Sequence, residues 1–225
     1  MNSKKLKAGI LIATLGVPAL VFLMFKFFGK NNFDLPYYFP VIDTNGEVKI
    51  SKGDTVFNHI PAFSLQDQSG KLCQVDTGTI KVVSFFFSRC GTICPMTNAN
   101  IKRVSGLISD KKRIQYYSIT VDPVYDRPEI LQTYRTKQGF TEPNWTFLTG
   151  DKKYIYDLAI KRFKLPVADA SEYDKGITDI DETFIHSDKL LLIDKEGFCR
   201  GIYTGTDKFE VDRLVLEIKV LLSQK

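Results

Sequence analysis

The stretch that decides the fold reads Ser84-Phe85-Phe86-Phe87-Ser88-Arg89-Cys90-Gly91-Thr92-Ile93-Cys94-Pro95. It follows a continuous apolar run that begins at Ile80, and such a run predicts a strand covered on both faces. Pro95 has no amide hydrogen to lose and therefore suits the first turn of a helix. The two cysteines, four residues apart, are thus expected in a loop between a buried strand and a helix.

Strands and helices alternate through the rest of the chain. The expected strands cover 80–87, 114–121, 145–148, 190–193 and 198–203, and the expected helices begin near Pro95, Asp126, Asp151 and Asp207. Asp126 and Asp151 are interpreted as N-caps, and at Asp126 a proline two residues later supports this interpretation. The alternation indicates an α/β fold, a three-layer sandwich around a mixed central sheet. The cysteine pair at the end of the first long strand makes a thioredoxin-like architecture the leading expectation. In such a sheet, active groups belong at the carboxyl ends of parallel strands.

The amino terminus has the pattern of a membrane anchor. Residues 8–28 contain one charge, Lys26, and about 20 apolar residues suffice to span a bilayer. We therefore expect residues 1–30 to form a single-pass transmembrane helix. The lysines that precede it predict a cytoplasmic amino end and a soluble domain on the extracytoplasmic (periplasmic) side. A cleaved signal peptide is the alternative, and it is disfavoured because no small-x-small cleavage site follows.

The remaining organisation is simple. Residues 31–58 are expected to form a tether with a short hairpin at Asn45-Gly46, and residues 59–225 the thioredoxin-like domain. Five of the 31 basic residues and none of the 26 acidic residues lie in residues 1–30, so the remainder carries equal numbers of each. The folded part is therefore neutral, which argues against a nucleic-acid partner.

The spacing of Cys90 and Cys94 allows two chemistries. On one helical turn their Cβ atoms lie about 5–6 Å apart on the same face. Both sulfurs can then bind one soft ion or close into a disulfide. The amino terminus of a helix favours thiolates through its unpaired amides and its dipole. Thiolates select Cu(I), zinc or iron–sulfur clusters.

A metal held by two thiolates requires a third donor, and the chain has two histidines. His59 is interpreted as a solvated residue at the entrance to the domain. His186 directly precedes the strand at 190–193, and in a thioredoxin-like sheet that loop faces the cysteine loop. Two thiolates and one imidazole form a three-coordinate site suited to Cu(I). A redox-only dithiol and a pair of inert structural cysteines remain as alternatives.

Several short motifs from about residue 60 to the carboxyl end occur in the order typical of one known family. They are Phe63-Ser64-Leu65, Cys90 to Pro95, Val121-Asp122-Pro123 with Asp126 and Pro128, Trp145 with Leu148-Thr149-Gly150, His186, and Asp194-Lys195-Glu196-Gly197. With these motifs the chain resembles the Sco/SenC family of membrane-anchored copper proteins.

The resemblance implies a copper metallochaperone, a binding protein rather than an enzyme. Copper, as Cu(I) or Cu(II), would be bound by Cys90, Cys94 and His186. It would be delivered to the binuclear CuA centre of cytochrome c oxidase, so the oxidase subunit that carries CuA is the implied partner. Thioredoxin-like reductants are a further implied partner because the site contains a dithiol.

The sequence departs from the family pattern around the cysteines. Gly91 and Thr92 replace a usual proline and acid, Ser88-Arg89 replaces a usual Thr-His, and Ile185 stands where an aspartate often precedes the histidine. These changes make the site less negative. Asp122 ends a strand beside the site, and we interpret it as a turn residue before Pro123 in preference to a residue that orients a ligand.

Two other functions use the same cysteines. A membrane-anchored thiol–disulfide oxidoreductase would use the Cys90/Cys94 dithiol as its redox-active catalytic pair to reduce partner cysteines. A thiol peroxidase is disfavoured because Phe87 stands where peroxiredoxins have a threonine. Cys73 and Cys199 are expected in hairpin strands as buried thiols that do not pair.

Overall fold

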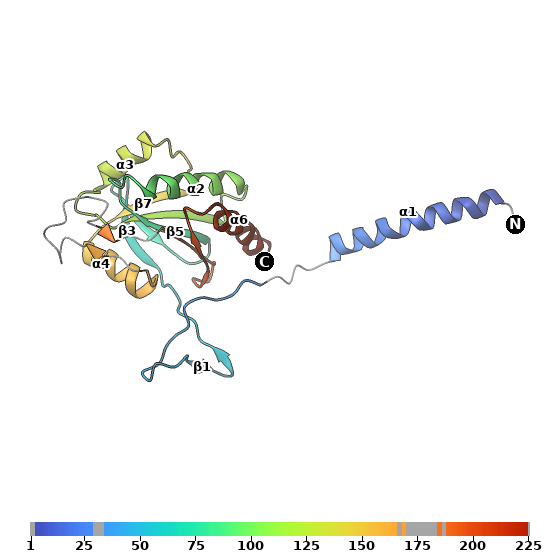
Figure 1. Ribbon diagram of the computed structural model, residues 1–225, viewed down its shortest axis with the longest axis horizontal. Helices are drawn as coiled ribbons and strands as arrows, with labels where there is room; N and C mark the ends of the chain where they lie inside the picture. The colour runs from blue at the N-terminus through green and yellow to red at the C-terminus, as the bar shows by residue number, and fades with distance from the viewer. Residues whose placement is uncertain (1–2, 29–33, 166–167, 170–183, 186–187, 225) are drawn as a thin grey trace. The chain divides into compact units, whose positions relative to one another are not determined.

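The computed structural model describes residues 3–28, 34–165, 168–169, 184–185 and 188–224 (Figure 1). The chain divides into two compact units, Met1–Asp34 and Leu35–Lys225. The first unit contains helix α1 (Ser3–Phe28), with Pro18 in its interior. A membrane-spanning helix is expected at residues 8–28. Among the described residues, no helix is both long enough and apolar enough to cross a membrane.

The second unit is built on a seven-stranded mixed sheet of order β11-β10-β5-β6-β7-β3-β4. Strands β5, β6 and β7 are parallel to one another, and the remaining pairs are antiparallel. This arrangement confirms the predicted α/β class with a mixed sheet. The strands are β3 (Phe63–Asp67), β4 (Leu72–Val75), β5 (Ile80–Phe86), β6 (Ile114–Thr120), β7 (Trp145–Thr149), β10 (Lys189–Ile193) and β11 (Cys199–Thr204).

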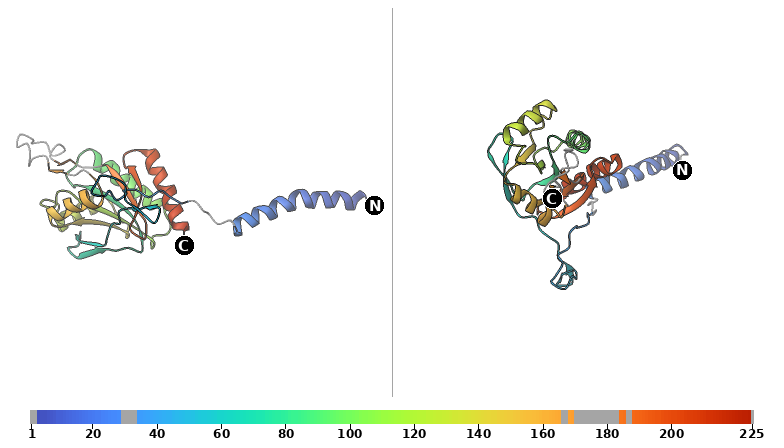
Figure 2. Two further views of the ribbon diagram at one scale, coloured as in Figure 1. Left: turned by 90° about the horizontal axis from the view of Figure 1, so that it is seen from below. Right: turned by 60° about the vertical axis from the view of Figure 1, so that its left-hand side comes forward.

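Helices cover both faces of the sheet (Figures 1 and 2). In Figure 1, α2 and α3 lie on one side of it and α4 on the other. Helix α6 packs beside α2, where Arg103 and Asp212 form an ion pair of 2.8 Å. The helices are α2 (Ile93–Leu107), α3 (Pro128–Lys137), α4 (Lys152–Asp157), which continues into a π-helical turn η1 (Leu158–Arg162), and α6 (Lys208–Ser223).

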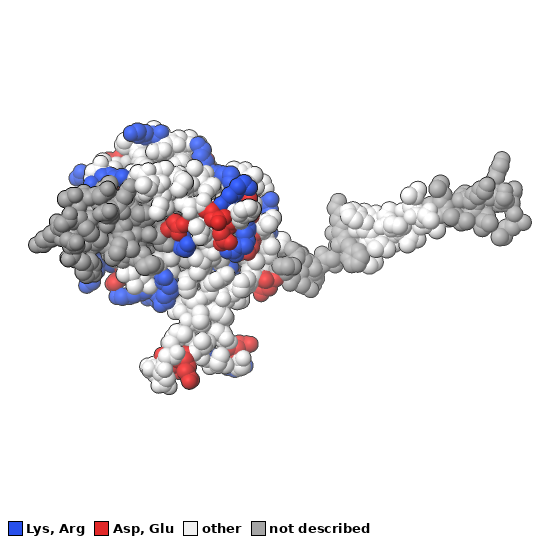
Figure 3. All heavy atoms as spheres, in the orientation of Figure 1, with Lys and Arg blue, Asp and Glu red and all other residues white. Residues whose placement is uncertain are grey.

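Two small ribbons complete the second unit. The first pairs β1 (Ile50–Ser51) with β2 (Asp54–Thr55), and the second pairs β8 (Ala168–Asp169) with β9 (Phe184–Ile185). The turn at Asn45-Gly46 is closed by Asp43, whose carboxylate accepts hydrogen bonds from the amides of Asn45 and Glu47. On the face shown in Figure 3, basic and acidic side chains are interspersed.

The core is centred on β5, which is buried along its whole length. A strand of apolar residues buries both faces when neighbours pair with both of its edges and helices cover both sides. One polar cluster lies inside this core. The Ser118 hydroxyl lies 3.0 Å from that of Ser84 and also accepts a hydrogen bond of 3.0 Å from the indole nitrogen of Trp145.

The predicted N-caps had different outcomes. Asp151 caps α4 as predicted, by accepting a hydrogen bond from the Tyr154 amide. Asp207, near which the last helix is expected to begin, also proves to be a cap and accepts hydrogen bonds from two first-turn amides of α6. The interpretation of Asp126 as the cap of α3 is wrong. Arg127 occupies that position without a side-chain hydrogen bond, because the Asp126 carboxylate is buried against Ser88 and Thr120.

The start of the second unit is fixed by a buried arginine. Arg200 forms an ion pair of 3.1 Å with Asp194, and both side chains are almost fully buried. Its guanidinium also donates hydrogen bonds to the carbonyls of Leu35 and Pro36 and lies 3.9 Å from the ring centroid of Tyr37. These contacts hold the entering chain at the start of β11.

The serine cluster gives a test of the core. Changing Ser118→Ala should lower the free energy of unfolding by about 1–3 kcal/mol, because the buried indole N–H loses its acceptor. Urea denaturation of the full chain, followed by the fluorescence of the single tryptophan, measures this. Ser109→Ala changes an exposed serine and should have almost no effect. Equal losses in the two variants would contradict the role of the cluster.

Candidate metal centre

The cysteine loop connects β5 to α2 at the carboxyl end of β5, as predicted. Cys90 lies in the loop and Cys94 in the first turn of α2. Both are buried, with exposed fractions of 6% and 3%. The amide of Cys94 donates a hydrogen bond of 3.4 Å to the sulfur of Cys90. The fold therefore places both cysteines at the amino terminus of one helix.

The sulfur of Cys90 takes the place of a helix-capping oxygen. Thr92 is the N-cap residue of α2, yet its side chain makes no capping hydrogen bond. Its hydroxyl lies 3.9 Å from the Cys90 sulfur, which itself receives the Cys94 amide. First-turn amides lack partners within the helix, and together with the helix dipole they stabilise negative charge. The site is thus suited to hold anionic sulfur.

All four cysteines are thiols in the structure. Cys73 lies in β4 and Cys199 in β11, which are the two opposite edges of the sheet. The prediction that they do not pair is therefore confirmed. Burial raises the pKa of Cys199 to about 12, so that thiol stays protonated and unreactive at neutral pH.

The loop before the cysteines is held by the turn that follows β6. The Asp126 carboxylate accepts hydrogen bonds from the amide of Ser88 at 2.9 Å, from the Ser88 hydroxyl, and from the Thr120 hydroxyl at 2.6 Å. Burial raises the pKa of Asp126 above its usual 3.8, although these hydrogen bonds oppose the shift. Asp126 therefore fixes Ser88, two residues before Cys90.

Asp122 does more than the turn role expected of it. Its carboxylate forms an ion pair of 2.6 Å with Arg89, the residue directly before Cys90. The guanidinium of Arg89 also lies 4.1 Å from the ring centroid of Tyr125. The preferred interpretation of Asp122 as a plain turn residue is therefore incomplete, and the charge of Arg89 is offset by a neighbour.

Tyr134 and Asn98 lie near the thiols, and no sequence motif predicted a role for either of them at this site. Asn98 follows Cys94 by one helical turn, and its amide nitrogen donates a 2.9 Å hydrogen bond to the Tyr134 hydroxyl. Burial raises the pKa of Tyr134 to about 12, and the neighbouring Cys94 and Cys90 add to the shift. The i, i+4 spacing from Cys94 was the available signal for Asn98, whereas Tyr134 comes from a separate helix.

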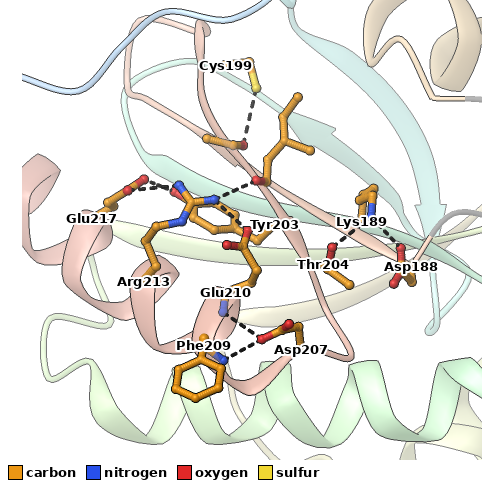
Figure 4. A network of polar contacts seen from close by, with 12 residues as sticks. Asp188, Lys189, Cys199, Tyr203, Thr204, Asp207, Phe209, Glu210, Arg213 and Glu217 are labelled. Carbon is orange, nitrogen blue, oxygen red and sulfur yellow. Dashed lines mark hydrogen bonds and ion pairs between the residues drawn. The ribbon is translucent and has the colours of Figure 1, made fainter.

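His186 lies outside the described residues, but the strand that follows it is described. Strand β10 runs antiparallel to β5, with Leu190 opposite Ser84. The start of β10 therefore lies at the carboxyl end of β5, the end that leads to the cysteines. Asp188, just before β10, accepts a 2.7 Å hydrogen bond from the Gly205 amide, and Figure 4 shows its contact with Lys189.

The other histidine lies at the opposite end of the sheet. His59 forms a bridge with Phe198, and their rings meet edge to face at 5.5 Å. Phe198 precedes β11, whose first residue pairs with Ile193 at the end of β10. Among the described residues, no three His, Cys, Asp or Glu side chains gather in a way that could hold a metal ion.

The buried Asp126 predicts a pH dependence of stability. Its folded-state pKa is raised, so between pH 3.8 and that raised value the folded state binds more protons than the unfolded state. This contribution to the free energy of unfolding is full below pH 3.8 and is lost as the pH rises through the folded pKa. Urea denaturation of metal-free wild type and Asp126→Asn from pH 3.5 to 7 measures it. Relative to wild type, the variant should gain stability with rising pH, and a relative loss would contradict the raised pKa.

Comparison with known proteins supplies the family. Residues 52–223 match the sequence profile of the SCO1/SenC family. The SCO1 protein homolog of Bacillus subtilis (strain 168) is 26% identical over 170 residues, which cover 74% of this chain and 84% of that protein.

Two solved structures share the fold. BsSco, a member of the Sco family of cytochrome c oxidase assembly proteins in which a disulfide switch was identified, is 25% identical with a TM-score of 0.62, over 75% of this chain and 95% of that chain. Yeast Sco1 with copper bound is 25% identical with a TM-score of 0.55, over 72% of this chain and 89% of that chain. Because the family match spans most of the second unit, this protein belongs to the SCO1/SenC family and has its thioredoxin-like fold.

Proposed function

We propose that this protein is a copper metallochaperone that binds Cu(I) or Cu(II) through Cys90, Cys94 and His186. The observation that carries the proposal is the 3.4 Å hydrogen bond from the Cys94 amide to the Cys90 sulfur. It means that the two thiols share the end of one helix, as two ligands of one ion require. Copper is the cargo in this proposal, since a chaperone must also release it.

The chemistry of the donors fits a soft metal. Cys90 and Cys94 are nearly buried, so hard ions that prefer oxygen ligands and water are disfavoured there. The amino end of α2 stabilises the thiolates that bind the metal. The yeast relative with copper bound supports copper as the ion.

His186 is proposed as the third ligand from the position of its neighbours. It precedes β10 by three residues, and β10 begins beside the carboxyl end of β5. The Gly205 carbonyl accepts a 2.8 Å hydrogen bond from the side chain of Asn100 in α2. Because the Gly205 amide also bonds to the Asp188 carbonyl, the chain two residues after His186 is tied to the helix that starts at the cysteines.

We further propose the CuA site of cytochrome c oxidase as the recipient. BsSco belongs to a family of oxidase assembly proteins, which supports this assignment. The proposal also retains an amino-terminal anchor at residues 1–30 that holds the copper domain on the extracytoplasmic side of a membrane. The anchor and its orientation stay predictions from the charge pattern of the sequence.

Copper binding by variants tests the ligand set. Reduced wild type, titrated with Cu(I) against a competing chelator, should bind one copper per chain. Cys90→Ser, Cys94→Ser and His186→Ala should each weaken binding by more than about 100-fold, beyond the 10- to 100-fold typical of changes outside the ligands.

Matched controls exist in the same chain. Cys73→Ser and His59→Ala remove the same residue types far from the site and should leave the affinity unchanged. Wild type that retains no copper would contradict the proposal of a copper metallochaperone. Transfer to an isolated CuA domain, measured by its visible spectrum, then tests the recipient separately.

A thiol–disulfide oxidoreductase is the second candidate function. It is favoured by the same Cys94 amide, which stabilises a thiolate on Cys90, and by the disulfide switch of BsSco. Thioredoxin-like reductants would then recycle the pair.

The role of His186 separates the two functions. Imidazole at this position has no required part in dithiol exchange, so His186→Ala should lose tight copper binding and keep its rate of reducing a disulfide substrate. The measurement compares Cu(I) affinity with the exchange rate in one preparation. Equal loss of both activities would remove the distinction.

A further inference from the structure

Arg89 is the residue directly before Cys90, and its side chain is held at two points. One guanidinium nitrogen lies 2.6 Å from the Asp122 carboxylate, and the guanidinium lies 4.1 Å from the centroid of the Tyr125 ring. We propose that this Arg89 clamp, formed by Arg89, Asp122 and Tyr125, is a positioning device that holds the Cys90 sulfur at the amino end of α2.

The acceptor side of the clamp is rigid. Asp122 is 5% exposed, and its amide donates a 3.0 Å hydrogen bond to the Thr120 hydroxyl. Its carbonyl accepts hydrogen bonds from the amides of Tyr125 at 3.2 Å and Asp126 at 2.8 Å. The turn after β6 is thus closed on itself, and the Asp122 carboxylate and the Tyr125 ring are presented from a fixed frame.

The clamp acts on the chain that precedes Cys90. On the preceding side, Ser88 is bonded to Asp126 through both its amide and its hydroxyl, and Arg89 is bonded to Asp122. The loop therefore cannot displace Cys90 without breaking contacts to this turn.

The geometry assigns Arg89 a role of position rather than of charge. The carboxylate 2.6 Å away offsets the positive charge of the guanidinium at close range. A planar guanidinium can bond to a carboxylate and stack on a ring at the same time, whereas a lysine ammonium cannot do both equally well. Arg89→Lys should therefore behave as a loss of function although it keeps the charge.

One backbone amide reports the position of the sulfur directly. Cys94 is the second residue of α2, so no carbonyl one turn earlier in the helix can accept from its amide, which bonds to the Cys90 sulfur instead. Amide hydrogen exchange at Cys94 consequently measures whether that sulfur stays in place, without any metal. Core amides of β5 serve as the reference for overall stability.

The experiment uses the full chain in its metal-free, reduced form. Arg89→Ala, Arg89→Lys and Asp122→Ala should each lower the protection of the Cys94 amide by about tenfold while the β5 amides keep theirs. The double variant Arg89→Ala/Asp122→Ala should show no loss beyond that of Arg89→Ala alone, because the Asp122 carboxylate acts in the clamp only through Arg89. Arg127→Ala is the matched control, since Arg127 is exposed and its ion pair with Glu129 spans 3.7 Å.

A second measurement connects the clamp to copper and rests on the proposed function. Cu(I) affinity should fall about tenfold in the three single variants and stay at the wild-type value in Arg127→Ala. Wild type that binds no copper would contradict the proposed function. The amide hydrogen exchange measured at Cys94 would still decide whether the clamp exists. The clamp itself is overturned if Arg89→Lys matches wild type at the Cys94 amide, or if Arg127→Ala loses protection equally.

Discussion

The pairing of β5 on both edges is the constraint from which the candidate site follows. Its parallel neighbour β6 ends in the turn that carries Asp122 and Asp126, and its antiparallel neighbour β10 begins just after His186. The end of β6 and the start of β10 therefore both lie at the carboxyl end of β5. A cysteine loop placed there has two acids on one side and the start of β10, which follows His186 in the sequence, on the other.

The two acids beside the cysteine loop differ in their surroundings. Asp126 is fully buried and is met by hydroxyls and an amide, so its charge is stabilised by dipoles alone. Asp122 faces a guanidinium that is partly open to solvent. The first contact fixes the backbone before the site, and the second holds a side chain at its rim. The loop is therefore attached by two contacts of different kinds.

Much of this arrangement could be predicted from the sequence, because its signals are local. The apolar run that became β5 and the caps at Asp151 and Asp207 depend on neighbouring residues only. Asp126 has the same local pattern as a cap, but its partner Ser88 lies 38 positions earlier. No local rule could weigh that contact. The same limit applies to Asp122 and Arg89, which meet only after β5 and β6 have paired.

The copper function is not encoded in the cysteine spacing. That spacing is compatible with both a metal site and a redox dithiol, and only the family resemblance implies copper and the oxidase. The fold adds the closeness of Cys90 to the first turn of α2 and the wide separation of Cys73 from Cys199. It also places His59 at the end of the sheet opposite the cysteines. His186 is the other histidine of the chain and thus the remaining candidate for an imidazole ligand.

The buried Arg200 has a consequence for how this protein can diverge. Its hydrogen bonds go to the backbone carbonyls of Leu35 and Pro36, which every amino acid possesses. Substitutions at those two positions therefore preserve the acceptors, and the hydrogen bonds depend only on the persistence of the arginine and Asp194. One interior cation thus specifies the polar contacts of the junction, while the buried side chain at position 35 is constrained separately by its packing in the core.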